Sequence, residues 1–213
     1  LVTHNLCKAL ARMRRKPKVL VSASAIGYYG HEGGPFTETA PAGRGFLADV
    51  CRGWEDALGP AREAGIRVVP LRLGMVISPL GGALPKILPA FRFGLGGPVG
   101  GGRQTVSWIG LDDVLGAVLH ALRTDALNGP VNAVAPEVLS NADFAATLGR
   151  VLGRPAGLSM PAAGARMLFG EKAEELLLSG AAVKPERLEQ TGYRFRHASL
   201  ESCLRHCLGR AEG

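Results

Sequence analysis

The chain has 213 residues, 46% of them hydrophobic, and a formal net charge of +7. This content is ample for a buried core, and no apolar run approaches the ~20 residues that a membrane-spanning helix needs. The basic residues are scattered except over residues 12–18, where a solvated helix end is a better reading than a nucleic-acid surface. We expect a globular protein with no membrane or nucleic-acid partner.

The first residues predict a helix that is already in progress. Val2, Leu6 and Leu10 recur at helical spacing within residues 1–13, and the first residue is Leu rather than Met. We therefore expect the chain to begin inside a domain. No charged segment followed by an apolar one is present, so no secretory signal is predicted and a cytoplasmic location is expected.

The next three elements predict a parallel sheet. Residues 18–24 form a short apolar run that ends in small residues before Gly27, which is typical of a buried strand opening into a loop. Residues 46–64 predict one helix and residues 66–73 a second strand. A strand, a crossover helix and a strand form a parallel unit that is covered on both faces, so a ligand is expected at the carboxyl ends of the strands.

The remainder predicts a glycine-rich loop, further strands and helices, and a small α+β lid. Ser140 is a good N-cap for its helix, and Gly153 with Pro155 would end that helix. The expected elements are a loop over residues 74–102, strands over 105–109 and 129–134, helices over 112–122 and 141–152, and a tail with a helix over 161–179, a helix start at Lys184, a strand over Tyr193–Phe195 and a helix from Ser199.

The cysteines are few and widely separated, which predicts reduced thiols rather than a disulfide framework. They are Cys7, Cys51, Cys203 and Cys207. Two of them flank His206, but a structural zinc site needs about four ligands, and none is grouped nearby in the sequence. We therefore predict no metal site, and we assign no chemistry to His120, His197 or His206.

Four motifs in order resemble one enzyme superfamily. They are Val21–Gly30, Leu71–Pro79, Gly94–Gln104 and Ser107–Asp113. Together they are similar to extended short-chain dehydrogenases/reductases, in particular the atypical nucleoside-diphosphate-sugar epimerase-like subgroup. The resemblance covers nearly the whole chain and implies an α/β fold with a Rossmann-like doubly wound parallel sheet. Residues 1–135 would form the carboxyl-terminal portion of the NAD(P)-binding domain, with 78–104 contributing to the substrate pocket, and residues 136–213 a small α+β substrate domain.

The resemblance also implies roles for individual residues, each with a plainer alternative. Tyr28 could be packing, Gly74 an ordinary bend, Arg103 an exposed loop residue and Trp108 a core residue. The implied catalytic residues are Ser24 and Tyr28; the cofactor contacts are Ala23, Gly27, Leu73, Gly74 and Val76; the substrate contacts are Phe91, Arg103 and Trp108. The implied cofactor is NADP, or NAD.

Three departures from the family pattern accompany this resemblance. The superfamily's Tyr and Lys, four apart on one helix, match Leu47 and Cys51, which cannot transfer the proton. The Gly-rich turn that binds the pyrophosphate is absent from the chain. Gly110 stands where relatives commonly have His.

Two functions remain open from the sequence. The first is an NAD(P)-binding epimerase-like oxidoreductase that acts on a nucleotide sugar or a small carbonyl compound. The alternative is a non-catalytic protein that uses bound NAD(P)H as a structural or sensing element. In either case we expect a further N-terminal segment or chain to complete the fold.

Overall fold

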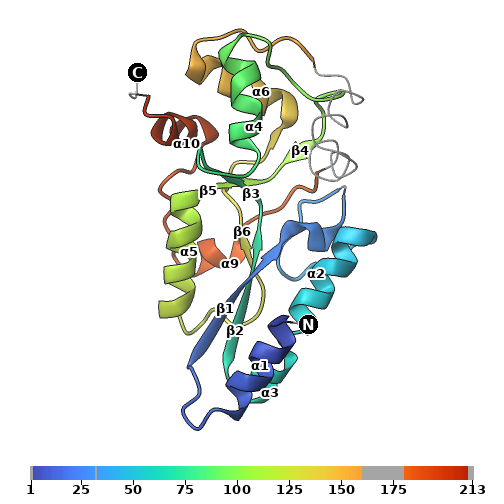
Figure 1. Cartoon of the computed structure of the whole chain (residues 1–213), viewed down its shortest axis with the longest axis vertical. Coiled ribbons are helices and arrows are strands. Elements are labelled where there is room, and N and C mark those ends of the chain that lie inside the picture. The colour runs from blue at the N-terminus through green and yellow to red at the C-terminus, as the bar shows by residue number, and fades with distance from the viewer. Residues whose placement is uncertain (1, 32, 160–179, 211–213) are drawn as a thin grey trace.

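The computed structural model describes residues 2–31, 33–159 and 180–210. At its centre lies a parallel sheet of three strands in the order β1-β2-β6 (Figure 1). These strands are β1 (Val19–Ala25), β2 (Arg67–Leu73) and β6 (Val131–Ala133). The predicted α/β fold with a parallel sheet is confirmed.

Helices cover both faces of this sheet, which explains why its strands read as nearly continuous apolar runs. Val68 packs with α1 (Val2–Arg12) and α3 (Gly59–Glu63) on one face. Val69 and Leu71 pack with α5 (Leu111–Arg123) on the other. Neighbouring residues of a strand point to opposite faces, so one short strand contributes to two cores.

A second group of elements forms the upper part of Figure 1 around one hydrophobic cluster. Ile77, Phe91, Trp108, Phe144 and Leu204 belong to this cluster. The elements are the parallel pair β3 (Met75–Ile77) and β5 (Trp108–Gly110), the antiparallel pair β4 (Thr105–Val106) and β7 (Leu139–Ser140), and the helices α4 (Leu84–Arg92), α6 (Asn141–Leu152) and α10 (Leu200–Cys207).

Three sequence-based expectations about elements were wrong. The single helix over residues 46–64 is two helices, α2 (Phe46–Asp56) and α3, because Gly59 and Pro60 interrupt it. The stretch 74–102 contains β3 and α4 rather than loop alone. Tyr193–Phe195 is not a strand. The expected helix over 161–179 lies outside the described residues.

The tail returns to the first loop of the chain. Phe36 donates its N–H to the Ala182 carbonyl over 2.8 Å, and Lys184 donates to the Phe36 carbonyl over 2.9 Å. This pairing follows the short helix η1 (Ile26–Tyr29) and leads into α9 (Glu186–Gln190), which packs against β6. Residues about 150 positions apart therefore lie side by side.

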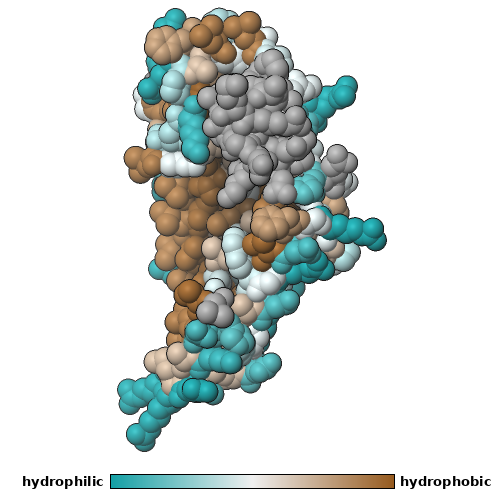
Figure 2. All heavy atoms as spheres, turned by 45° about the vertical axis from the view of Figure 1, so that its right-hand side comes forward, coloured by the Kyte–Doolittle hydropathy of each residue, from teal (hydrophilic) through white to brown (hydrophobic). Residues whose placement is uncertain are grey.

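An apolar surface lies along β1 and α5. β1 is the outer strand of its sheet among the described residues, and α5 exposes Leu111, Leu115, Leu119 and Leu122. Figure 2 shows an apolar band at the height where β1 and α5 lie in Figure 1. Within the described ranges, no helix has both the length and the hydropathy of a membrane span.

Candidate functional site

Three polar side chains stand in a row across the parallel sheet. Ser24 of β1 is the register partner of Arg72 of β2, and Arg72 is the register partner of Asn132 in β6. Residues at one register of neighbouring parallel strands point to the same face. All three are buried, and Arg72 is only 2% exposed. The sheet therefore builds a polar row near its carboxyl end.

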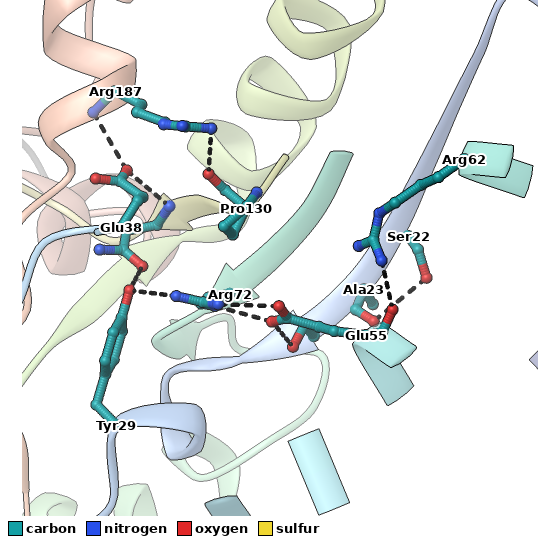
Figure 3. Close-up of polar contacts among 11 residues, drawn as sticks. Ser22, Ala23, Tyr29, Glu38, Glu55, Arg62, Arg72, Pro130 and Arg187 are labelled. Atoms are coloured by element: carbon teal, nitrogen blue, oxygen red, sulfur yellow. Dashed lines mark hydrogen bonds and ion pairs between the residues drawn. The ribbon is translucent and has the colours of Figure 1, made fainter. Parts of the chain in front are cut away.

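Glu55, at the end of α2, supplies the negative charge for this row (Figure 3). Arg72 donates from Nε to Glu55 Oε1 over 2.8 Å and from Nη2 to Glu55 Oε2 over 2.9 Å. The Ser24 hydroxyl donates to Glu55 Oε1 over 2.9 Å. The two bonds to Glu55 fix the plane of the Arg72 guanidinium. The hydroxyl proton of Ser24 is engaged with the same carboxylate.

Two tyrosines complete the surroundings of Arg72. Its Nη1 donates to the Tyr29 hydroxyl over 2.8 Å, and that hydroxyl donates to Asn132 Oδ1 over 2.7 Å. The guanidinium carbon lies 3.4 Å from the centre of the Tyr28 ring, a cation–π contact. Tyr28 thus packs on Arg72 with its ring.

Electrostatic interactions and burial fix the charge states of Arg72 and Tyr29. Burial works against the charge on Arg72, but its bonds to Glu55 and the adjacent Tyr29 outweigh burial and raise its pKa. Burial also raises the pKa of Tyr29, although the nearby Arg72 opposes that shift. Arg72 stays charged and the Tyr29 phenol stays protonated at neutral pH, so this phenol is not a ready proton acceptor.

Glu38 links the row to the tail. Its Oε1 accepts the N–H of Asn132 over 3.0 Å and the N–H of Arg187 over 3.2 Å (Figure 3). Asn132 Nδ2 in turn donates to the Lys184 carbonyl over 2.9 Å. Burial raises the pKa of Glu38, and among the described residues its Oε2 has no hydrogen-bond partner. The loop after η1, β6 and the tail are therefore joined at one carboxyl group.

If Leu47 and Cys51 match the superfamily's Tyr and Lys, both should lie on the side of their helix that faces Ser24, and they do. A side chain at Gly27 would meet Leu47 Cβ at 3.2 Å and Cys51 Sγ at 3.6 Å. Glu55, one further turn along α2, reaches Ser24. Burial raises the pKa of the Cys51 thiol, so this thiol is not a ready proton acceptor, and Leu47 has no titratable group.

The residues proposed to contact a cofactor lie around the carboxyl ends of β1 and β2 and at the start of β3. Ala23 is exposed, and Gly27, Leu73, Gly74 and Val76 are half-buried. Gly74 has a structural reason to be glycine, because a Cβ would lie 2.7 Å from the Ser107 carbonyl oxygen and 2.9 Å from Val134. These residues come together as expected, and their cofactor roles remain predictions.

The residues proposed to contact a substrate are not gathered at the same place. Phe91 and Trp108 belong to the cluster beneath α4 and α6, and Trp108 is fully buried. Arg103 is exposed in the loop before β4. The core-residue alternative given for Trp108 therefore describes that side chain as it stands. Phe91 packs in the same cluster, and both substrate roles stay predictions.

Sequence reasoning missed most of the polar network. It selected Ser24 and Tyr28 but assigned no role to Arg72 or Asn132. A usable signal existed, because Arg72 and Asn132 each sit between apolar residues of a buried strand, and a buried polar residue needs a partner. The partners Glu55 and Glu38 come from distant segments, and no local pattern identifies them.

Comparisons with known proteins agree with this architecture. The human epimerase family protein SDR39U1, solved with NADPH, matches 99% of this chain and 72% of that chain, with a TM-score of 0.86 at 32% identity. A nucleoside-diphosphate sugar epimerase from Corynebacterium glutamicum matches 97% of this chain and 41% of that chain, with a TM-score of 0.79 at 35% identity. The fold and site define a Rossmann-like protein of the short-chain dehydrogenase/reductase class.

The sequence relatives narrow this class to one family. An epimerase family protein of Mycobacterium bovis is 43% identical over 87% of this chain and 62% of its own length. Human SDR39U1 is 37% identical over 95% of this chain and 70% of its own length. A domain of unknown function (DUF1731) matches residues 160–207. The chain belongs to the epimerase family that includes SDR39U1, and it spans less than two thirds of the mycobacterial relatives.

Proposed function

We propose that this chain forms the carboxyl-terminal part of an NADP(H)-binding protein, with the nicotinamide near Ser24, Gly74 and Val76. The observation that carries this proposal is the similarity of 99% of the chain to a human relative solved with NADPH. The expected preference for NADP over NAD rests on the same relative. A cytoplasmic location remains a prediction, and one relative, from Arabidopsis thaliana, is chloroplastic.

The residues present suit one end of the cofactor. At the end of β1, Ala23 is exposed and Gly27 is half-buried, so a flat ring can approach the backbone closely. Bound nicotinamide would supply hydride transfer. The pyrophosphate needs a glycine-rich turn at a helix N-terminus, and this chain contains none. The residues of this chain therefore suit the nicotinamide end of the cofactor, with Ser24, Gly74 and Val76 beside the ring.

The candidate reaction is epimerase-like chemistry on a nucleotide sugar or a small carbonyl compound. A proton donor other than the usual Tyr and Lys pair is then required, since Leu47 and Cys51 occupy those positions. Tyr28 is the remaining candidate near Ser24. Its ring contact with Arg72 would orient the phenol, while Arg72 itself remains paired with Glu55.

A second candidate is a protein that holds NADP(H) without turning it over. Two observations favour it: the Ser24 hydroxyl donates to Glu55 rather than pointing to open space, and burial raises the pKa of Tyr29 and Cys51. These groups form a stable interior network, which suits a structural or sensing role of the cofactor.

Calorimetric titration of the full-length protein with NADPH and NADH tests the cofactor assignment. We expect NADPH binding that Ala23→Leu weakens at least tenfold, because the larger side chain fills the space beside the strand end. Ala9→Leu, on the exposed face of α1, is the matched control. Absence of binding by either dinucleotide would overturn the assignment. Following the absorbance of reduced nicotinamide over carbonyl and sugar-nucleotide substrates then separates the catalytic from the non-catalytic candidate.

We further propose that the apolar surface on β1 and α5 is covered by an additional segment. The leucines of α5 are exposed at helical spacing beside an edge of β1 that no other strand of the described residues covers, and parallel strands are normally buried. The proposed occupant is the further N-terminal segment expected from the sequence; the chain spans 62% of the Mycobacterium bovis relative. We expect the 213-residue chain alone to aggregate and Leu115→Lys with Leu119→Lys to reduce this. A cooperatively melting monomer of the unaltered chain that binds NADPH would contradict the proposal.

A further inference from the structure

Three side chains with metal-ligand chemistry meet where α5, residues 196–197 and α10 come together. One ligand atom from each of Asp112, His197 and His206 lies within 4.8 Å of the others. His206 Nε2 is 3.0 Å from Asp112 Oδ2, and the two imidazole rings have centroids 4.7 Å apart. The cluster is separate from the polar row around Arg72.

An ordinary surface ion pair would account for Asp112 and His206 but not for His197. His197 is only 7% exposed, and among the described residues its Nε2 has no hydrogen-bond partner. Its Nδ1 lies 3.0 Å from the Ser202 hydroxyl. If Nδ1–H donates to Ser202, Nε2 keeps a free lone pair, which is how metal-binding histidines are commonly oriented. A buried imidazole nitrogen without a partner calls for a ligand.

We propose that Asp112 Oδ2, His197 Nε2 and His206 Nε2 bind a divalent cation of the zinc class. Two imidazoles and one carboxylate are ligands that zinc accepts, with water in the fourth position. In a tetrahedral zinc site the ligand atoms are about 3.3 Å apart, so the observed spacing needs only small side-chain movements. His206 is 56% exposed, which leaves a path for the ion.

Two neighbours shape this site. Arg196 Nη1 lies 3.2 Å from Asp112 Oδ2, but the Arg196 side chain is 68% exposed and can turn away into solvent when a cation binds. Gly110 lies on the inner side, where a Cβ would be 2.9 Å from Cys203 Sγ and 3.9 Å from the His197 ring. The glycine at position 110, where the resembled family commonly has His, therefore leaves the space beside His197 free of a second side chain.

The bound ion would join α10 to the start of α5. Asp112 lies in the first turn of α5, and His206 in the last turn of α10. Sequence spacing predicted no metal site, because Cys203, His206 and Cys207 have no fourth ligand nearby and His197 has no partner at a ligand spacing. The fold instead brings His197 and His206 to an aspartate about 90 residues earlier. We therefore assign the ion a structural role in fixing the carboxyl-terminal helix.

Zinc binding to the full-length protein, without a histidine tag and stripped of metal, tests this proposal. Competition with a chromophoric chelator should give one zinc per chain. We expect His197→Ala, His206→Ala and Asp112→Asn each to weaken binding at least tenfold, and zinc to raise the melting temperature of the unaltered protein. His4→Ala, on α1, is the matched control and should bind as the unaltered protein does.

Equal zinc stoichiometry and affinity in all four variants, or no binding by the unaltered protein, would overturn the proposal. Should His197→Ala fail to fold, the other two variants still decide, since Asp112 and His206 are partly exposed. Cobalt substitution provides an independent readout. We expect tetrahedral visible bands without a thiolate charge-transfer band, and a thiolate band would assign the ion to Cys203 or Cys207 and overturn this ligand set.

Discussion

The Arg72–Glu55 ion pair is almost fully removed from solvent, with side-chain exposures of 3% and 11%. Removing one partner of a buried pair leaves an uncompensated charge, which typically costs about 3–5 kcal/mol. We therefore expect Glu55→Gln or Arg72→Met to lower the free energy of unfolding by several kcal/mol. Urea denaturation of the full-length protein measures this change.

The exposed pair Arg150–Glu201 is the matched control for this prediction. Its side chains are 59% and 35% exposed, and surface pairs contribute about 0–1 kcal/mol. Arg150→Gln should therefore have little effect. The double variant Glu55→Gln with Arg72→Met should recover part of the loss, since both charges are gone. A loss at Glu55 no larger than that at Arg150 would show that the network is not buried as described.

Glu38 makes stability depend on pH. Burial raises its folded-state pKa above the ordinary glutamate value, so its contribution is full below that value and is lost as pH rises through the raised pKa. Glu38→Gln keeps an acceptor oxygen but does not titrate. Between about pH 4 and pH 7 we expect a smaller decrease in unfolding free energy for this variant than for the unaltered protein. Glu63→Gln, on the exposed surface of α3, is the matched control for the substitution itself.

At the residue scale, the sequence pointed to Ser24 and Tyr28 but not to the buried polar residues that contact them. Ser24 was selected because Val21–Gly30 resembles the strand and loop that carry the family's active-site Ser, and the structure places Ser24 in the polar row. Arg72 and Asn132 were predicted only as parts of strands. The residues that form hydrogen bonds with them come from α2, η1 and the loop at Glu38, which are distant in the sequence. Register across a sheet is a property of tertiary structure, so local spacing does not reveal it.

Gly74 marks the point at which the chain leaves one sheet and enters another. Its N–H donates to the Ala133 carbonyl over 3.1 Å, and the next N–H, of Met75, donates to the Ser107 carbonyl over 2.9 Å. A Cβ at Gly74 would overlap Ser107 and Val134. We expect Gly74→Ala to destabilise the protein by about 1–3 kcal/mol, as measured by thermal or urea unfolding.

Gly81→Ala is the control, because nothing lies within 4 Å of its added Cβ. It should change the free energy of unfolding by no more than about 0.5 kcal/mol. If Gly74→Ala kept full stability and lost only NADPH binding, the glycine would serve the cofactor and not the packing of the two sheets.

At the element scale, strong local signals predicted elements well. The helix over residues 141–152 was located with its Ser140 cap, and the structure has the full capping box with Asp143. By contrast, α4 was missed because glycines and prolines surround it. Pro85 sits in its first turn, where proline is tolerated, and Pro89 follows one turn later. Composition alone therefore does not predict this helix. Its apolar face packs in the hydrophobic cluster that also contains Ile77 of β3.

At the scale of the whole molecule, folding buries the cysteine thiols fully or in part. Burial raises the pKa of all four cysteine thiols, that of Cys203 to about 12, and thiolate is the reactive form. At about pH 8 we expect the native protein to react with a disulfide reagent at least ~100-fold more slowly than the protein unfolded in guanidinium. Cys207, only half-buried, should react first, and Cys207→Ser should remove that earliest phase. Rapid labelling of Cys203 before Cys207 would contradict the packing of α10.

The pairing of residues 182–184 with Phe36 also has a consequence for the integrity of the backbone. Upstream of the DUF1731 match, Ser159 donates to the carbonyls of Pro98 and Gly100; beyond residue 180, the tail is bound to Gly33 and Phe36 and to Ser107. Each side of residues 160–179 is thus held by its own hydrogen bonds. If a protease site engineered between residues 165 and 166 of the full-length protein were cut, the two fragments would separate on a denaturing gel but elute together in gel filtration. On this expectation the protein can be reassembled from two polypeptides.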